Sequence, residues 1–137
     1  MTTTVYNAGL DAISTWTTDD FGFLLVDSSY VPDVDDVYVS EVLAAELAGV
    51  GYSRQPVTGP TRTVDNTLDR IVYNCDDLDF GDIVTGEVAD AMILYKFVTN
   101  DADSLLVAHY SLGGIATTGT AFFVAIGTAG AIFLRQG

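Results

Sequence analysis

The sequence predicts a mainly β fold: a β-sandwich or jelly-roll-like single domain with two short α-helices near the N-terminal third. Short apolar runs recur along the chain, and turns rich in Gly and Asp separate them. Strands at such spacing are typical of sandwiches and jelly rolls. The length of 137 residues is also the usual size of one domain. We therefore expect one β-rich domain over residues 1–137.

The two expected helices flank a strand. Residues 6–15 contain several good helix formers, although Gly9 weakens the pattern. The apolar run 21–26 is bounded by aspartates, which indicates a buried strand. A second helix is expected to begin at Ser40 as its N-cap and to end at Gly49.

The rest of the chain is expected to form strands joined by turns. The expected strands are 52–57, 61–64, 69–74, 91–98, 104–111, 121–126 and 131–135, with 76–82 as an acidic loop or edge. Asp65 and Asn66 join two of these strands as a turn would. The last two strands are expected to pair with each other around Gly127–Gly130.

Residues 110–134 carry no charge and are numerous enough to cross a bilayer as a helix. Five glycines interrupt the stretch, and its apolar residues fall into two blocks of strand length. We therefore expect two central strands of a sheet rather than a membrane helix. So much uncharged surface also suggests that part of it meets another subunit.

The charge balance limits the partners. Five Lys and Arg stand against 19 Asp and Glu, for a net charge of −14. Phosphate binding depends on clustered Lys and Arg, so we expect neither nucleic acid nor an anionic membrane surface as a partner. The first residues lack the basic and apolar regions of a signal peptide, and Cys75 is the one cysteine. These features favour a protein made in a reducing cytosol.

No set of residues indicates an enzyme or a cofactor site. His109 is the one histidine, and strand alternation places it opposite Leu106 and Ala108. The chain has no Gly-x-Ser-x-Gly sequence and no phosphate-binding glycine loop. Cys75 lies beside Asp76 and Asp77, so its pKa should not be lowered and the thiol should be inert. We expect a protein without catalytic residues or cofactors.

Two acidic loops are weak candidates for Ca²⁺ ligands, because hard cations bind several carboxylate oxygens. The candidate ligands are Asp33, Asp35 and Asp36 in one loop and Asp76, Asp77 and Asp79 in the other. Neither loop has the glutamate that would complete an EF-hand. The more common role of such residues is to bond to their own backbone in turns.

Eight residues are candidates for contact with a protein partner. Arginines can bind carboxylates through two hydrogen bonds, and exposed aromatic rings supply contact area. The candidates are Arg54, Arg62, Arg70, Arg135, Trp16, Phe122, Phe123 and Phe133. Trp16 could stack on a sugar or a partner, but a Trp in such a segment more often covers the core.

Six short segments, spread along the chain, together form a recognisable sequence pattern. They are residues 6–10, 24–30, 46–55, 76–80, 91–95 and 122–134. The third contains the pattern Glu-Leu-x-Gly-x-Gly-Tyr-x-Arg. Through these segments, which are spread over nearly the whole chain, the sequence resembles a family of small acidic virion structural proteins of tailed bacteriophages, of the capsid decoration, or cement, type.

The resemblance implies a protein on the outer capsid surface, made in the host cytoplasm. Its expected partners are the major capsid protein and copies of itself, as a trimer or another cyclic oligomer with residues 1–6 as an extended arm. It implies no catalytic or cofactor-binding residues. The alternatives are a virion protein of the tail, neck or fibre, and a carbohydrate- or Ca²⁺-binding β-sandwich module.

Overall fold

A computed structural model describes residues 2–127 and 130–135, the last three by their backbone. This part of the chain is mainly antiparallel β, which confirms the predicted fold class. The strands are β1 (Thr3–Val5), β2 (Phe21–Val26), β3 (Gln55–Pro56), β4 (Thr61–Asp65), β5 (Arg70–Asn74), β6 (Leu78–Asp82), β7 (Val88–Lys96), β8 (Leu105–Ala116), β9 (Ala121–Val124) and β10 (Ile132–Arg135). The helical elements are α1 (Asn7–Ala12) and three 3₁₀ turns, Ile13–Thr15, Val39–Glu41 and Leu43–Ala45.

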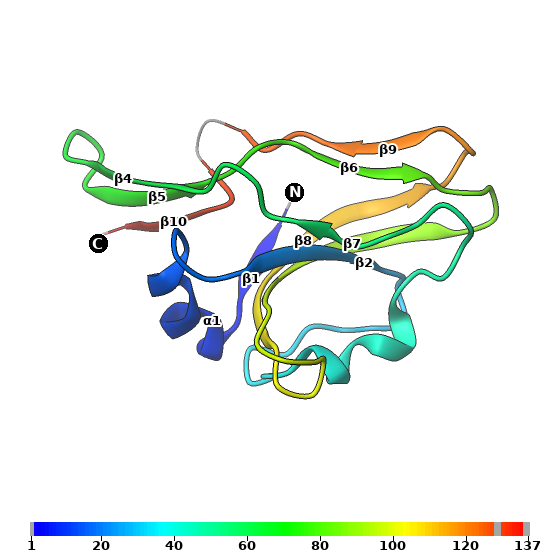
Figure 1. Cartoon of the computed structure of the whole chain (residues 1–137), viewed down its shortest axis with the longest axis horizontal. Helices are drawn as coiled ribbons and strands as arrows, with labels where there is room; N and C mark the ends of the chain where they lie inside the picture. The colour runs from blue at the N-terminus through cyan, green and yellow to red at the C-terminus, as the bar shows by residue number, and fades with distance from the viewer. Residues whose placement is uncertain (1, 128–129, 136–137) are drawn as a thin grey trace.

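The elements form three layers (Figure 1). A five-stranded sheet with the order β1-β8-β7-β2-β3 lies in the middle. Above it in the view lie two smaller sheets, β10-β5-β4 at the left and β6-β9 at the right. Below it lie α1, the 3₁₀ turns of residues 39–45 and the loop that joins β7 to β8. The central sheet is therefore covered on both faces.

Two apolar clusters fill the spaces between the layers. The upper core joins the central sheet to the small sheets and contains Phe23, Leu25 and Phe80. The lower core joins it to the segments below and contains Leu24 and Val26. Successive side chains of a strand point to opposite faces, so β2 contributes to both cores and all six of its residues are buried.

The prediction of a second helix at residues 40–49 is wrong, because two 3₁₀ turns occupy this segment. The Glu41 carboxylate accepts hydrogen bonds from the N–H groups of Val37 and Tyr38. These bonds satisfy donors just before the first turn. Glu46 is already extended, and its backbone pairs with Val26 of the central sheet. The first predicted helix is found, but it consists of α1 followed by a 3₁₀ turn.

The last two strands were expected to pair with each other and to be central. Both expectations are wrong, because β9 pairs with β6 and β10 pairs with β5. Each lies at an edge of its small sheet in the described part of the chain. The uncharged stretch 110–134 is thus divided among three sheets. No helix among the described residues combines the length and hydropathy that a membrane crossing needs.

Residues 2–6 do not form an arm that leaves the domain. Instead, β1 pairs with β8 through Thr3↔Tyr110 and Val5↔Ala108. The next residue, Tyr6, is fully buried in the lower core. The expected N-terminal arm is therefore an edge strand of the central sheet.

Candidate functional site

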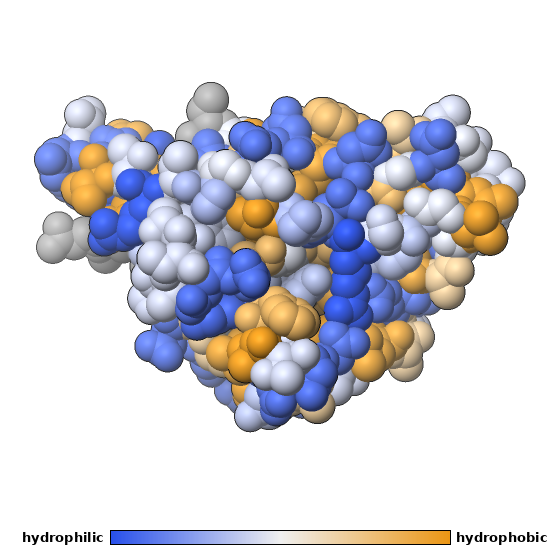
Figure 2. All heavy atoms as spheres, viewed as in Figure 1, coloured by the Kyte–Doolittle hydropathy of each residue, from blue (hydrophilic) through white to orange (hydrophobic). Residues whose placement is uncertain are grey.

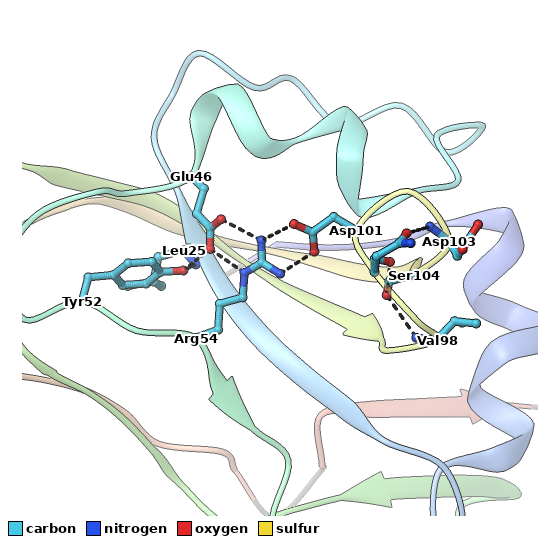
Figure 3. Close-up of polar contacts among 9 residues, drawn as sticks. Leu25, Glu46, Tyr52, Arg54, Val98, Asp101, Asp103 and Ser104 are labelled. Atoms are coloured by element: carbon cyan, nitrogen blue, oxygen red, sulfur yellow. Dashed lines mark hydrogen bonds and ion pairs between the residues drawn. The ribbon is translucent and has the colours of Figure 1, made fainter.

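Arg54 lies at the centre of the densest polar cluster of side chains in the described residues (Figure 3). Its Nε and Nη2 donate to Glu46 Oε2 at 2.7 Å and Oε1 at 2.8 Å. Its Nη1 and Nη2 donate to Asp101 Oδ1 at 2.7 Å and Oδ2 at 3.2 Å. The guanidinium also lies 5.4 Å from the centre of the Tyr95 ring, within the range of a cation–π contact.

This cluster joins segments that are distant in the chain. Glu46 follows the 3₁₀ turns, and Asp101 belongs to the loop between β7 and β8. Tyr52 adds a third connection, because its hydroxyl donates to Glu46 Oε2 at 2.6 Å and accepts from the N–H of Leu25. Hydrogen bonds to Glu46 raise the pKa of Arg54 above its ordinary value. Arg54, which was predicted to be an interface residue, is thus bonded to carboxylates of its own chain. We name Arg54, Glu46 and Asp101 the clasp, because they link three segments of the fold.

The candidate aromatic residues divide into buried and exposed. Trp16 is only 1% exposed, its ring packs edge-on against Phe21, and its Nε1 donates to the carbonyl of Asn74. Phe122 is buried against Phe80. Both belong to the upper core, so neither offers a surface to a partner.

Phe123 is different, because it is 60% exposed. Phe133 and Arg135 lie in β10, and their side chains fall outside the described residues. Of the candidate aromatic residues whose side chains the structure describes, the exposed one is therefore Phe123, on β9.

The remaining arginines lie on the β4–β5 hairpin, residues 61–74, which we name the docking hairpin. Arg62 is exposed on β4. Arg70 on β5 is half-buried and lies 3.3 Å from Asp65, its cross-strand neighbour. The hairpin extends from the left end of the molecule in Figure 1. Arg62 and Arg70 thus lie on one projecting element but on opposite faces of it, because Arg62 pairs with Tyr73 and Arg70 with Asp65.

The first acidic loop bonds to its own part of the chain. Asp33 accepts from the N–H of Asp35. Asp35 accepts from the side-chain amide of Asn7, and Asp36 accepts from the hydroxyl of Tyr30 at 2.7 Å. Each carboxylate therefore has a donor from the protein.

The second acidic loop is similar. Asp76 accepts from the Thr58 hydroxyl, Asp77 from the N–H of Ile126, and Asp79 from the N–H of Gly81. Among residues 2–127 and 130–135, no three His, Cys, Asp or Glu side chains are grouped so that they could hold a metal ion. The structure therefore places these six aspartates in turns and loop contacts.

His109 is buried, and the predicted strand alternation is wrong around it. The pairs Leu94↔Ala108 and Tyr95↔Leu106 leave Val107 as an extra residue. Leu106 consequently lies in the lower core, whereas Ala108 lies in the upper core. The imidazole of His109 lies beside the Tyr30 ring, and its Nε2 has no hydrogen-bond partner among the described residues. Burial lowers the pKa of His109.

Cys75 has the inert character that the sequence predicts. Burial, together with the negative charges of Asp76 and Asp77, raises the pKa of its thiol to about 11. Nucleophilic cysteines need the thiolate, which a raised pKa disfavours. The thiol is therefore protonated near neutral pH.

A hollow of about 500 Å³ lies beside Trp16. Its polar groups include Asp19, which is ion-paired with Lys96 at 3.0 Å, and the already occupied Arg54. Hydrogen bonding to Lys96 lowers the pKa of Asp19. These charged groups are engaged with one another, so the hollow has the character of a surface depression.

Comparison with known proteins identifies no relative: no family model matches the chain, and neither a curated protein nor a solved structure is similar to it. The functional argument therefore depends on the surface of the molecule. Two elements of that surface are distinctive, the docking hairpin and the exposed edge of β9.

Proposed function

We propose that this protein is a non-enzymatic structural component of a tailed-phage virion. In this proposal it is a capsid decoration protein that binds the outer shell as a symmetric oligomer. The observation that carries the proposal is the docking hairpin, an electrically neutral projection on a strongly acidic body. The resemblance of the sequence to small acidic virion proteins supports the same role.

The exposure of the docking hairpin suits a docking element. A strand in an antiparallel sheet usually buries one face against a core. In β4, by contrast, Thr61, Arg62, Thr63 and Val64 are all exposed. The apolar side chains of Val64 and Leu68 are 56% and 46% exposed. The hairpin therefore offers a partner both backbone edge and apolar contact.

The distribution of charge supports the same use. The docking hairpin contains two arginines and two aspartates, so the net charge of −14 resides in the rest of the chain. Such a charge keeps copies soluble before assembly and repels packaged DNA, which suits an exterior position. Approach to another protein meets least repulsion at the neutral hairpin. Arg62, which makes no ion pair with a described residue, can bind a carboxylate of the shell.

The first test is the position and copy number of the protein in purified particles. A decoration protein is expected in proportion to the major capsid protein, on the outer surface of the shell. A copy number that matches one tail or neck ring would contradict the decoration role and support the tail alternative. Absence from the particle would overturn the virion proposal altogether.

The second test addresses the docking hairpin. Purified protein is added to shells that lack it, and bound protein is measured by co-sedimentation. We expect Val64→Asp combined with Arg62→Glu to reduce binding at least about tenfold, the effect of losing roughly 1.4 kcal/mol. Val31→Asp, at an exposed apolar position of another loop, is the control for one added carboxylate and should bind normally. Equal binding by both variants would show that the hairpin is not the docking element.

A further inference from the structure

The outer edge of β9 has no partner strand in the described part of the chain. On its inner side β9 pairs with β6 through Leu78↔Val124, Asp79↔Phe123 and Asp82↔Ala121. The two strands form a sheet of their own. The opposite side of β9 therefore presents backbone N–H and C=O groups that a further strand could pair with. We name this side the β9 edge, residues 121–124.

The β9 edge lacks the side chains by which proteins prevent such pairing. Exposed edge strands usually carry a lysine or another charge, a proline or an inward-pointing charged residue. Residues 121–124 are Ala, Phe, Phe and Val, without a charge or a proline. Phe123, in the middle of this edge, is 60% exposed. β9 is short and its pairing with β6 has a register shift, which limits how many residues can pair. An apolar edge without a charge or a proline is nevertheless suited to pairing with another chain.

The end of β8 extends this apolar surface. Ile115 is 47% exposed, and it lines a groove of about 210 Å³ together with Phe122, Phe123 and two residues of the connection to β9. The pairing of β1 with β8 extends no further along β8 than Thr3↔Tyr110. Beyond Ser111, which donates to the carbonyl of Thr2, β8 is paired with β7 alone among the described strands. The apolar surface thus continues from β9 onto the end of the central sheet.

We propose that the β9 edge is the surface through which two copies of this chain pair, antiparallel and about a two-fold axis. An antiparallel pairing of one strand with itself is self-complementary, which a two-fold interface requires. It joins two two-stranded sheets into one four-stranded sheet. Isolated two-stranded sheets are marginally stable, so the added strands stabilise both partners.

The local absence of charge allows a second copy to meet this edge. Two bodies of charge −14 repel each other, and residues 110–134 are without formal charge. Asp79 and Asp82, which pair with Phe123 and Ala121, lie on β6. Asp77 accepts from the N–H of Ile126, beyond the end of β9. In the pair, the two β6 strands are separated by three strand spacings, about 14 Å. That distance exceeds the Debye length of about 8 Å at physiological salt. The β9 edge therefore allows two acidic copies to meet with little repulsion.

The inference deepens the self-association included in the proposed function and rests on it, but its test needs no virus particle. The mass of the purified full-length chain is measured by sedimentation over a range of concentrations. We expect a dimer for the natural chain and at least about a tenfold weaker dimer for Phe123→Asp, the effect of losing roughly 1.4 kcal/mol. Val31→Asp, at an exposed apolar position of the loop that follows β2, should leave the dimer unchanged.

Hydrogen exchange of the natural chain gives a second readout that does not depend on how a variant folds. Amides of residues 121–124 should exchange more slowly as the protein concentration rises, while those of residues 61–65 should not change. A monomer at all concentrations, a dimer that Phe123→Asp leaves intact, or a trimer would each overturn the two-fold pairing. If the dimer is found but the protein is absent from particles, the virion proposal fails alone. If the protein decorates particles as a monomer, the β9 edge proposal and the symmetric oligomer fail, while the decoration role stands.

Discussion

Arg54 binds Glu46 through two parallel hydrogen bonds, from Nε and Nη2, while the other side of the guanidinium binds Asp101. Glu46 follows the 3₁₀ turns, and Asp101 belongs to the loop between β7 and β8. The backbones of these two segments also meet, because the N–H of Ser40 donates to the carbonyl of Asp101. Arg54 itself precedes β3, an edge strand of the central sheet. Its side chain therefore links three segments through two carboxylates and adds to the backbone contacts that two of them already make.

Replacement of Arg54 by Ala should lower the free energy of unfolding. It leaves two carboxylates close together without a cation. We expect a loss of about 2 kcal/mol, between the values typical of exposed and buried ion pairs, since the Arg54 side chain is 25% exposed. Arg54→Lys should recover only part of the loss, because an ammonium cannot make two parallel bonds. Urea denaturation measures both, and Arg62→Ala on the exposed hairpin is the control, with a change below about 0.5 kcal/mol. Equal stability of all variants would contradict the clasp.

Acidification should destabilise the protein through His109. Burial lowers the pKa of His109 in the folded state, while the unfolded value is about 6.5. Between the two values the unfolded chain binds more protons, so stability falls as pH decreases below about 6.5. The groups that face the imidazole are Tyr30 and the carboxylate of Asp90, whose charge acts in the opposite direction.

The measurement for His109 is urea denaturation at pH about 7.5 and about 5.5, one unit on either side of the unfolded pKa. Carboxylates also titrate toward acid, so the natural chain is compared with His109→Gln. The variant should lose less stability than the natural chain over the same interval. An identical loss in both proteins would mean that His109 does not contribute.

Gly9→Ala should be strongly destabilising, although alanine is the better helix former. A Cβ at residue 9 would lie 2.3 Å from the carbonyl oxygen of Val107 on β8. The gain in helix propensity is about 1 kcal/mol, whereas forcing the backbones apart should cost about 3 kcal/mol. Thermal unfolding monitored by circular dichroism measures the net loss. Gly127→Ala is the control, because no described atom lies within 4 Å of its added Cβ. A stabilised Gly9→Ala variant would contradict the close contact of α1 with β8.

Salt should stabilise the protein. A net charge of −14 on one small domain produces self-repulsion, and the Debye length falls from about 10 Å at 0.1 M to about 3 Å at 1 M. We expect the melting temperature to rise by about 5 °C over that range, which corresponds to roughly 1 kcal/mol. The double variant Asp11→Asn and Asp103→Asn, at two exposed positions, should show a smaller rise. A melting temperature that falls with salt would show that attractive ion pairs outweigh the repulsion.

The sequence predicted those elements whose ends are fixed by residues next to them in the chain. β2 is bounded by aspartates and was found at the predicted residues. The β4–β5 hairpin was also predicted, because Asp65 and Asn66 form a turn between alternating strands. Asp65 accepts from the N–H groups of Thr67 and Leu68, which is the common role of aspartate in turns.

Tertiary contacts decided the elements that were not predicted. Residues 40–49 contain helix formers, but Glu46 bonds to Arg54 and its backbone joins the central sheet. These contacts override a weak local propensity. For β9 and β10, apolar content identified strands but not their partners. A pattern of side chains specifies which face of a strand is buried, and it does not specify which distant strand lies beside it.

The clasp at Arg54 was also not predicted. Its acidic partners lie 8 and 47 residues away, so no short motif marks them. One signal was present in the composition: with 19 acids and five bases, a cation in this chain is surrounded by potential carboxylate partners. The exposure of Phe123 had no sequence signal, because Phe122 beside it is equally apolar and is buried.

The burial of β2 on both faces has a consequence for the divergence of this protein. Phe21–Val26 separates two apolar compartments, so a polar group introduced on either face of the strand has no route to water. Distant homologues are expected to retain an uninterrupted apolar hexapeptide at this place while their loops and surface charges change. This hexapeptide, between flanking aspartates, is the segment from which remote ancestry can best be traced.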